Sequence, residues 1–378
     1  MSGRPARTKS GELSVAATSV TMLAPCLRTL PATNFDISHK RYTRRYLDFM
    51  TNHQSRNVIV TRAKVIKYLR EFLEIRNFLE VETPILGDRV GGATARPFVT
   101  WHNEWGKELS MRIAPELYLK MLVIGGFERV FEIGKLFRNE GVDHTHNPEF
   151  TSCEFYQAYA DYHDLVRLTE ELLSGMVDTL GLSPSHQGTQ LDFSKPFNKI
   201  EFLPSLEAAC NATFPAPDQL HSEDSLRFLV SQCAAHEVEV GPVVTAAKLL
   251  DKLVSRLVEP ELVQPTFLLH HPLVMSPLAK QHRDVPGLAE RFELFIAGKE
   301  VANAYTELND PDEQRRALAR VAQLSAGDPE AMLPDEAYCK ALEYGLPPTA
   351  GWGAGIDRLV MVLTETPSIR DVITFPLT

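Results

Sequence analysis

Two stretches of this sequence, some two hundred residues apart, decide its fold. The first reads Phe137-Arg138-Asn139-Glu140-Gly141, continues as His146-Asn147-Pro148-Glu149-Phe150 and ends with Glu154-Phe155-Tyr156. The second reads Gly351-Trp352-Gly353-Ala354-Gly355-Ile356-Asp357-Arg358. Each stretch sets an arginine where it can meet a phosphate group, because the guanidinium fork matches the oxygen geometry of phosphates and carboxylates.

Alternate side chains of a strand lie on one face of its sheet. Strands over 129–140 and 149–156 would therefore place Arg138 with Glu140, and Phe150 and Ser152 with Glu154 and Tyr156. Between 301 and 307, the odd positions Val301, Asn303, Tyr305 and Glu307 share a face in the same way. Any one of these polar faces fits contact with solvent. The three together favour a binding site, because solvated strands more often carry Lys, Thr and Glu.

The other periodicities predict helices and strands in separate blocks. Apolar residues at helical spacing predict a helix over 57–77, with one face formed by Val60, Ala63, Ile66, Leu69, Phe72 and Leu73. We expect strands at 78–86, 126–140, 149–160, 265–270, 291–297 and 300–308, helices at 164–181 and from Gly355, and a mostly helical block at 204–262. This order indicates an α+β fold. The sequence has neither a P-loop nor a dinucleotide-binding fingerprint.

The bulk composition is that of an ordinary globular protein. Of 378 residues, 44% are hydrophobic and 23% are charged, and no apolar run approaches the ~20 residues that cross a bilayer. We therefore expect a soluble protein with no membrane partner. The net charge of −10 argues against a general nucleic-acid coat, although 40–45 forms either a basic patch or a solvated helix start. Five scattered cysteines indicate reduced thiols and no zinc site.

Residues 1–35 differ in composition from the rest of the chain. They hold four basic residues against the single acid Glu12, which is typical of a mitochondrial transit segment. The run from Arg7 to Val15 instead predicts a β-hairpin with its turn at Gly11. We favour the hairpin, followed by a linker over 31–40.

The two deciding stretches resemble motifs 2 and 3 of class II aminoacyl-tRNA synthetases, and 147–156 is similar to the lysine-specific members. The resemblance covers roughly 40–378, with a weak motif 1 at 57–86. It implies a catalytic domain at 36–378, built on a mostly antiparallel sheet flanked by helices, with a helical insert at about 204–262. Residues 1–35 would be a remnant of the N-terminal anticodon-binding OB-fold, a β-barrel that needs five strands to close.

The resemblance also implies an ATP site. Arg138 would contact the α-phosphate and the substrate carboxylate, Glu140 would accept a hydrogen bond from the adenine amino group, and Phe150 would stack on adenine. Arg358 would lie near the γ-phosphate. The implied catalytic residues are Arg138 and Arg358, and the implied ATP-binding residues are Arg138, Glu140, His146, Asn147, Phe150, Glu293, Gly351, Gly353, Gly355 and Arg358.

By the same resemblance, the amino acid is lysine. A buried ammonium group needs opposing charge and full hydrogen bonding, and two carboxylates with a phenol can supply both. Glu154, Tyr156 and Glu307 would hold the ε-ammonium group, and Glu116 the α-ammonium group. The implied lysine-binding residues are Gly92, Glu116, Arg138, Glu154, Tyr156, Asn303, Tyr305 and Glu307.

Glu293 and Glu300 are the implied Mg²⁺ ligands, since magnesium beside phosphates takes few protein ligands and keeps several waters. On a regular strand, however, Glu300 is out of phase with Asn303, Tyr305 and Glu307. It needs either a β-bulge or a place in the turn at Gly298-Lys299.

The sequence thus predicts ATP- and Mg²⁺-dependent activation of L-lysine and its transfer to the acceptor end of tRNA(Lys) by a homodimer, cytoplasmic or mitochondrial. Two alternatives stay open. One is a paralogue that attaches lysine, or an isomer of it, to a protein. The other is an inactive relative that serves as a binding module.

Overall fold

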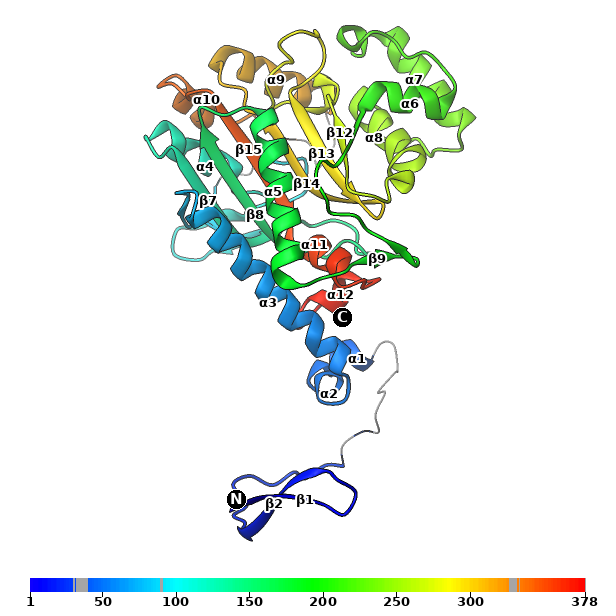
Figure 1. The fold of residues 1–378 in the computed structure, drawn as a ribbon. Helices are drawn as coiled ribbons and strands as arrows, with labels where there is room; N and C mark the ends of the chain where they lie inside the picture. The colour runs from blue at the N-terminus through cyan, green and yellow to red at the C-terminus, as the bar shows by residue number, and fades with distance from the viewer. Residues whose placement is uncertain (30, 32–39, 89–90, 326–331, 333, 378) are drawn as a thin grey trace. The chain divides into compact units, whose positions relative to one another are not determined.

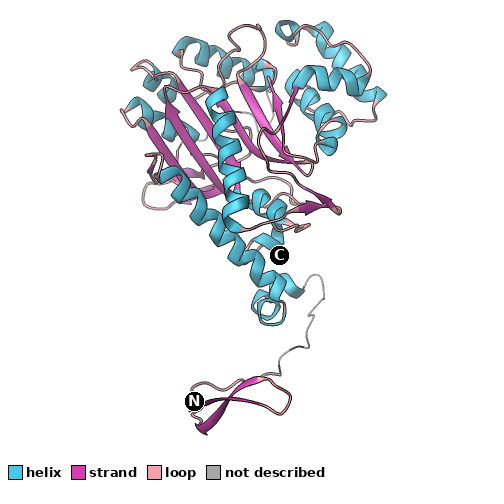
Figure 2. Cartoon of the chain, viewed as in Figure 1, coloured by secondary structure: helices cyan, strands magenta, loops and turns pink. Residues whose placement is uncertain are grey.

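The computed structural model describes residues 1–29, 31, 40–88, 91–325, 332 and 334–377 (Figures 1 and 2). The chain divides into two compact units, Met1–His53 and Gln54–Thr378. The first unit contains an antiparallel hairpin of β1 (Ser2–Arg7) and β2 (Leu13–Ser19), and helices α1 (Lys40–Thr43) and α2 (Arg45–Thr51). The hairpin is confirmed, with Arg7 paired to Leu13 and Gly11 at a φ of +86°, which glycine adopts without steric cost.

Two expectations for this region end differently. The linker over 31–40 and the domain boundary at 35/36 lie almost wholly outside the described residues. The basic patch over 40–45 is wrong as an exposed surface at Arg45, whose side chain is buried and forms an ion pair with Asp48. A guanidinium group buried in this way needs its carboxylate partner.

The second unit is organised on one mixed sheet. Its eight described strands run in the order β11-β12-β13-β14-β15-β8-β7-β3. The outer pairs β11–β12 and β3–β7 are parallel and all the others antiparallel, which confirms the expected α+β architecture. The strands are β3 (Leu79–Glu80), β7 (Arg129–Phe137), β8 (Glu149–Ala158), β11 (Asn198–Glu201), β12 (Thr266–Leu269), β13 (Arg291–Ile296), β14 (Lys299–Thr306) and β15 (Thr349–Gly355).

Smaller elements surround this sheet. Strands β4 (Leu86–Gly87), β5 (Val99–His102) and β6 (Lys107–Met111) form a second sheet, and β9 (Ser185–His186) pairs with β10 (Thr189–Gln190). The helices outside the insert are α3 (His53–Glu74), α4 (Glu116–Ile124), α5 (Tyr162–Leu180), α9 (Pro311–Leu324), α10 (Glu336–Leu342), α11 (Ile356–Leu363) and α12 (Ile369–Val372). In the described part of the chain, no helix combines the length and apolarity needed to cross a bilayer.

The main core lies between one face of the large sheet and helices α3, α5 and α11, as Figure 1 shows for α3 and α5. Helix α3 confirms the predicted helix but corrects its buried face. Val60 and Ala63 are exposed, whereas Val58 and Val65 enter the core with Leu69, Phe72 and Leu73. The helix carries apolar residues on more than one face, so its periodicity alone does not select the side that meets the sheet.

The helical insert has a core of its own. It comprises α6 (Phe202–Cys210), α7 (Glu223–Ala235), α8 (Ala246–Leu257) and the short 3₁₀ turns η1 (Pro217–Gln219) and η2 (Glu259–Glu261). Leu249, Leu250 and Leu253 of α8 pack in this core with Leu229 and Cys233 of α7, and the block expected at 204–262 is mostly helical. Thr245 caps α8 by accepting a hydrogen bond from the backbone N–H of Lys248, which satisfies a donor at the helix start.

Strand alternation separates core from cavity in β8. Cys153 and Phe155 of β8 lie in the main core, where Phe155 stacks on Trp352 with ring centroids 4.9 Å apart. The intervening residues Glu154 and Tyr156 line a cavity on the opposite face. Aromatic pairs of this kind stabilise a core beyond the area that they bury.

Replacing Phe155 by alanine should lower the free energy of unfolding by about 3–5 kcal/mol, because it removes a fully buried ring and leaves a void between Phe78 and Trp352. Phe375→Ala is the matched control, since that ring is 71% exposed, and we expect a change within about 0.5 kcal/mol. Urea denaturation followed by circular dichroism measures both. Equal effects would contradict the assigned core.

Candidate functional site

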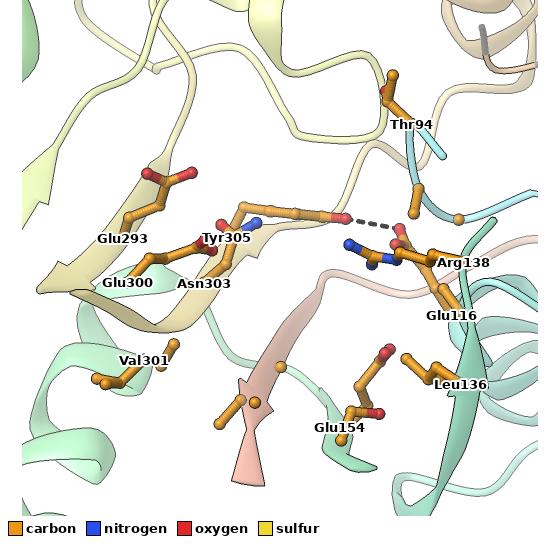
Figure 3. Close-up of a pocket in the computed structure, with 18 of the residues that line it drawn as sticks. Thr94, Glu116, Leu136, Arg138, Glu154, Glu293, Glu300, Val301, Asn303 and Tyr305 are labelled. Carbon is orange, nitrogen blue, oxygen red and sulfur yellow. Dashed lines mark hydrogen bonds between the residues drawn. The ribbon is translucent and has the colours of Figure 1, made fainter. Parts of the chain in front are cut away.

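A cavity of about 590 Å³ lies on the sheet face opposite the main core (Figure 3). Strands β8, β14 and β15, the loop after β7 and helix α8 of the insert all contribute to its walls. Seventeen of the eighteen predicted site residues line this one cavity, and the exception is Glu307. Convergence of this kind from segments far apart in the sequence makes the cavity the candidate site.

Glu154 and Tyr156 form an acidic wall of the cavity. Strand β8 directs both side chains to one side, as predicted, and the Tyr156 hydroxyl lies 3.4 Å from Glu154 Oε2 as a donor. Burial raises the pKa of Glu154 to about 8, with Glu116 adding to the shift and Arg138 opposing it. A cation that binds beside this carboxyl group would favour its ionised form.

Glu116 lies at the first position of α4 and faces the cavity across from β14. Its Oε1 accepts a hydrogen bond of 2.7 Å from the Tyr305 hydroxyl, drawn as a dashed line in Figure 3. Gly92, with a φ of +85°, packs so closely that a Cβ there would meet the Cβ of Glu116 at 2.9 Å. The backbone therefore comes close to Glu116 only because residue 92 is glycine.

Glu307 follows β14 and is almost wholly buried, but it does not line the cavity. Its Oε2 lies 2.7 Å from the ammonium group of Lys120, which also contacts Glu116 Oε1 at 2.6 Å. Sequence reasoning missed Lys120. The available signal was a lysine four residues after Glu116, hence on the same face of a helix that is otherwise rich in apolar residues.

Arg138 is set against the ring of Phe150. The centre of its guanidinium group lies 5.1 Å from the ring centroid, within the range of a cation–π contact. Its Nε is buried and has no hydrogen-bond partner among the described residues. Burial lowers the pKa of Arg138, while Glu140, Glu300 and Glu154 oppose the shift. The arginine is thus held in place with capacity left for an anionic ligand.

Arg358, on α11, forms the second cationic point. Its guanidinium group contacts Glu300 Oε2 at 3.2 Å and His146 Nε2 at 2.8 Å. His146 is in turn oriented by Asp143, 2.8 Å from its Nδ1. The side-chain nitrogen of Asn147 donates to the backbone carbonyl of Glu149. The side-chain oxygen Oδ1 of Asn147 is buried and has no partner in the described structure. The loop between β7 and β8 is therefore tied to α11.

Glu293 and Glu300 reach the cavity from adjacent strands, and the register explains how. Phe295 pairs with Glu300 while Leu294 pairs with Ala302, so a β-bulge lies at Val301. This confirms the bulge that the phase of Glu300 required. Partial burial and the neighbouring Glu293 raise the pKa of Glu300, with Arg358 opposing.

The Glu293 carboxylate already has partners. It lies 2.6 Å from an Arg291 nitrogen and 3.2 Å from His271 Nε2. Burial alone would raise the pKa of Glu293, but His271 and Arg291 lower it to about 2. Arg291 also donates to the Asn303 side-chain oxygen at 3.1 Å, so the Asn303 amide group can donate into the cavity.

The insert adds acids that sequence reasoning did not assign to the site. Asp251 of α8 and Glu259 of η2 both line the cavity. Burial raises the pKa of Glu259 to about 7. The hydrogen bond from Ser255 opposes this shift, and the nearby Glu293 carboxylate adds to it. Neither residue belongs to a recognised motif, and helical periodicity marks Asp251 only as a polar break in an apolar stripe. Among the described residues, no group of three or more His, Cys, Asp or Glu could hold a metal ion.

The three predicted glycines of β15 differ in the space that a Cβ would have at each position. At Gly351 a Cβ would lie 2.1 Å from Glu307 Oε1 and 2.5 Å from Tyr156 Cε1. At Gly353 and Gly355 the nearest atoms are at 3.4 Å and 4.0 Å, ordinary contact distances. Only Gly351 is sterically required within the protein, and it is required by the acidic wall.

Comparison with known proteins agrees with this geometry. The family model described as class II tRNA synthetases (D, K and N) matches residues 38–378. The chain is 52% identical to lysine–tRNA ligase cla4 of Cladosporium cladosporioides, 53% to a probable cytoplasmic lysine–tRNA ligase of Encephalitozoon cuniculi and 50% to the lysine–tRNA ligase of Aquifex aeolicus. Each match covers 99% of this chain, which spans 66%, 76% and 63% of those relatives. The chain therefore belongs to the class II tRNA synthetases of the D, K and N group, in their lysine–tRNA ligase family.

Proposed function

We propose that this chain activates L-lysine with ATP to form lysyl-adenylate and pyrophosphate, and then transfers the lysyl group to the 3′ end of tRNA(Lys). The observation that carries the proposal is the convergence of Glu116, Glu154 and Arg138 in one cavity. Two carboxylates can bind the two ammonium groups of lysine, and the guanidinium fork can bind its carboxylate. The matching relatives support the same substrate.

Activation needs no general base. The lysine carboxylate is already ionised near neutral pH, and one of its oxygens attacks the α-phosphorus as the bond to the bridging oxygen of pyrophosphate breaks. Arg138 lies against Phe150, on which adenine is proposed to stack, and from there it can stabilise charge that develops on the α-phosphate. Binding and orientation are therefore the main contribution of the protein.

The triphosphate is proposed to lie toward Arg358 and His146, which already contact each other. Glu293 and Glu300 are the proposed Mg²⁺ ligands, since their adjacent carboxylates in one cavity suit a hard cation that keeps most of its water. When bound, magnesium would neutralise charge on the phosphates and thereby favour departure of pyrophosphate. The raised pKa of Glu300 beside Glu293 fits a place for a cation.

A homodimer is proposed on the apolar side chains that α3 and the strands after it leave exposed. These side chains are Val60, Ile75, Leu79, Ile85, Leu86 and Val99, each at least 43% exposed. We propose that these side chains form one apolar patch, since large exposed apolar patches mark protein interaction sites. For the hairpin at 2–19 we propose the remnant of an OB-fold, and for the remainder of the chain the catalytic domain. For the location we propose the cytoplasm, which is the location named for the Encephalitozoon relative.

Lysine-dependent exchange of labelled pyrophosphate into ATP tests the first step, and charging of total tRNA with labelled lysine tests the second. We expect both activities, since the cavity holds groups for both lysine ammonium groups and for its carboxylate. Exchange without charging would favour a protein acceptor in place of tRNA. Absence of exchange would leave only a binding module.

Replacing Glu154 by glutamine should raise the KM for lysine by about 10- to 100-fold and the KM for ATP by less than about threefold, because the charged partner of an ammonium group is lost. Glu140→Gln is the reciprocal variant, and it should raise the KM for ATP alone. Steady-state exchange kinetics measure both pairs of constants. Parallel changes in both KM values for either variant would count against the assigned ends of the cavity.

Lysine binding should release protons near pH 7 and progressively fewer above pH 8, because burial raises the pKa of both Glu154 and Glu307 to about 8. Free Glu154, with a pKa of about 8, is mostly protonated near neutrality, and a bound ammonium group favours its ionised form. Lysine affinity should therefore increase as the pH rises from 6 to about 8. Calorimetry in buffers of different ionisation enthalpy measures the proton count. The same count with Glu154→Gln would assign the proton to another group.

A further inference from the structure

Lys120 is the most deeply buried cation of the cavity region. It lies on α4 with no exposed surface, and its Nζ contacts Glu116 Oε1 at 2.6 Å and Glu307 Oε2 at 2.7 Å. The ring of Tyr338 lies against the ammonium group, 5.3 Å from Nζ to centroid. Burial alone would lower the pKa of Lys120, but Glu116 and Glu307 raise it well above its ordinary value. Lys120 is therefore a permanent positive charge.

The ammonium group joins two acids from distant parts of the chain and leaves one oxygen of each available. Glu307 Oε1 is buried, has no hydrogen-bond partner in the described residues and lies where a Cβ at residue 351 would stand if Gly351 carried a side chain. Glu116 Oε2 lies on the side of Gly92. Gly92 and Gly351 both line the cavity, so the two available oxygens lie beside its wall at two separate points.

The charges balance only if Lys120 is counted. Glu116, Glu154 and Glu307 bring three buried carboxylates to this region, and a bound lysine supplies two ammonium groups. Lys120 provides the third. An uncompensated buried carboxylate is costly, so the internal ammonium group lets the protein use three acids for a substrate with two cationic ends.

We propose that Lys120 is a specificity-determining positioning residue, which fixes the separation between the Glu116 and Glu307 carboxylates and so sets the length of amino acid that reaches both. The inference rests on the proposed function. It assigns Glu116 to the α-ammonium group and Glu154 to the ε-ammonium group. Glu307 does not itself line the cavity, so we assign its available oxygen to the same ε-ammonium group through the space that the missing side chain of Gly351 leaves in the wall.

The contacts of Lys120 fix the distance between the Glu116 and Glu307 carboxylates. Glu116 is on a helix, Glu307 follows a strand 187 residues after Lys120, and one ammonium group connects them directly. The Tyr305 hydroxyl fixes the same Glu116 oxygen from a second direction. Ornithine is shorter than lysine by one methylene, so it cannot engage both carboxylates at full strength. One methylene typically yields discrimination of about 10- to 200-fold.

The test is the ratio of kcat/KM for lysine to that for ornithine in pyrophosphate exchange, measured for the wild type, Lys120→Met and Lys120→Arg. We expect a wild-type ratio above about tenfold. Methionine keeps the length of the side chain but removes the charge, so the KM for lysine should rise by at least about tenfold and the ratio should fall below about threefold. The KM for ATP should change by less than about threefold.

Arginine separates charge from geometry. It keeps the positive charge but brings a longer, planar group, which changes the separation of the two carboxylates. Lys120→Arg should therefore recover part of the affinity for lysine while its preference over ornithine stays reduced. Lys135→Met is the matched control. That lysine pairs with Glu149 at 3.1 Å in a half-exposed ion pair outside the cavity, so both constants should stay unchanged.

Two results would overturn the inference. One is a pair of wild-type kcat/KM values for lysine and ornithine that differ by less than about threefold. This measurement does not depend on the folding of any variant. The other is a folded Lys120→Met, with a melting temperature close to that of Lys135→Met, that keeps both the KM for lysine and the ratio. The proposed function fails separately, if the wild type shows no lysine-dependent exchange.

Discussion

The ion pairs of Lys120 with Glu116 and Glu307 lie where the protein excludes water, and the acidic end of the cavity depends on them. Two carboxylates this close would repel each other and take up protons if no cation stood between them. With Lys120 between them, the two carboxylates are held by ion pairs, and each keeps one oxygen for another partner. Gly351 belongs to the same constraint, since any side chain there would collide with Glu307 and Tyr156.

The antiparallel sheet carries this constraint to the rest of the site. Alternation on β8 sends Phe155 into the core and Glu154 into the cavity, so the packing of one face fixes the geometry of the other. The stack of Phe155 on Trp352 joins β8 to β15 directly behind the acidic wall. Where alternation would fail, at Glu300, a β-bulge restores the side chain to the cavity. The same sheet therefore carries residues of both the proposed amino acid end and the proposed nucleotide end.

Positive groups are distributed along the cavity in the order that the proposed reaction needs. Lys120 lies behind the acids, Arg138 faces Phe150, and Arg358 lies with His146 and Glu300. Each has a partner that limits its motion before any substrate binds. Such preorganisation lowers the cost of reaching the transition state, because little must be rearranged when charge develops. The insert adds Asp251 and Glu259 to the cavity wall, near the carboxylates that we propose for the nucleotide end.

Sequence alone determined the parts of this protein that repeat locally or match a family motif. Short-range spacing gave the strands expected at 126–140 and 149–160, which are shorter in the structure as β7 and β8, and the helix from Gly355. It also gave the shared face of Glu154 and Tyr156 and the need for a bulge near Glu300. Tertiary structure alone decided which side of α3 meets the sheet, the burial of Arg45, the place of Glu307 outside the cavity wall and the role of Lys120. Most of these features depend on contacts between residues far apart in the sequence, such as the 187 positions between Lys120 and Glu307. Periodicity does not indicate which distant side chain will supply the opposing charge.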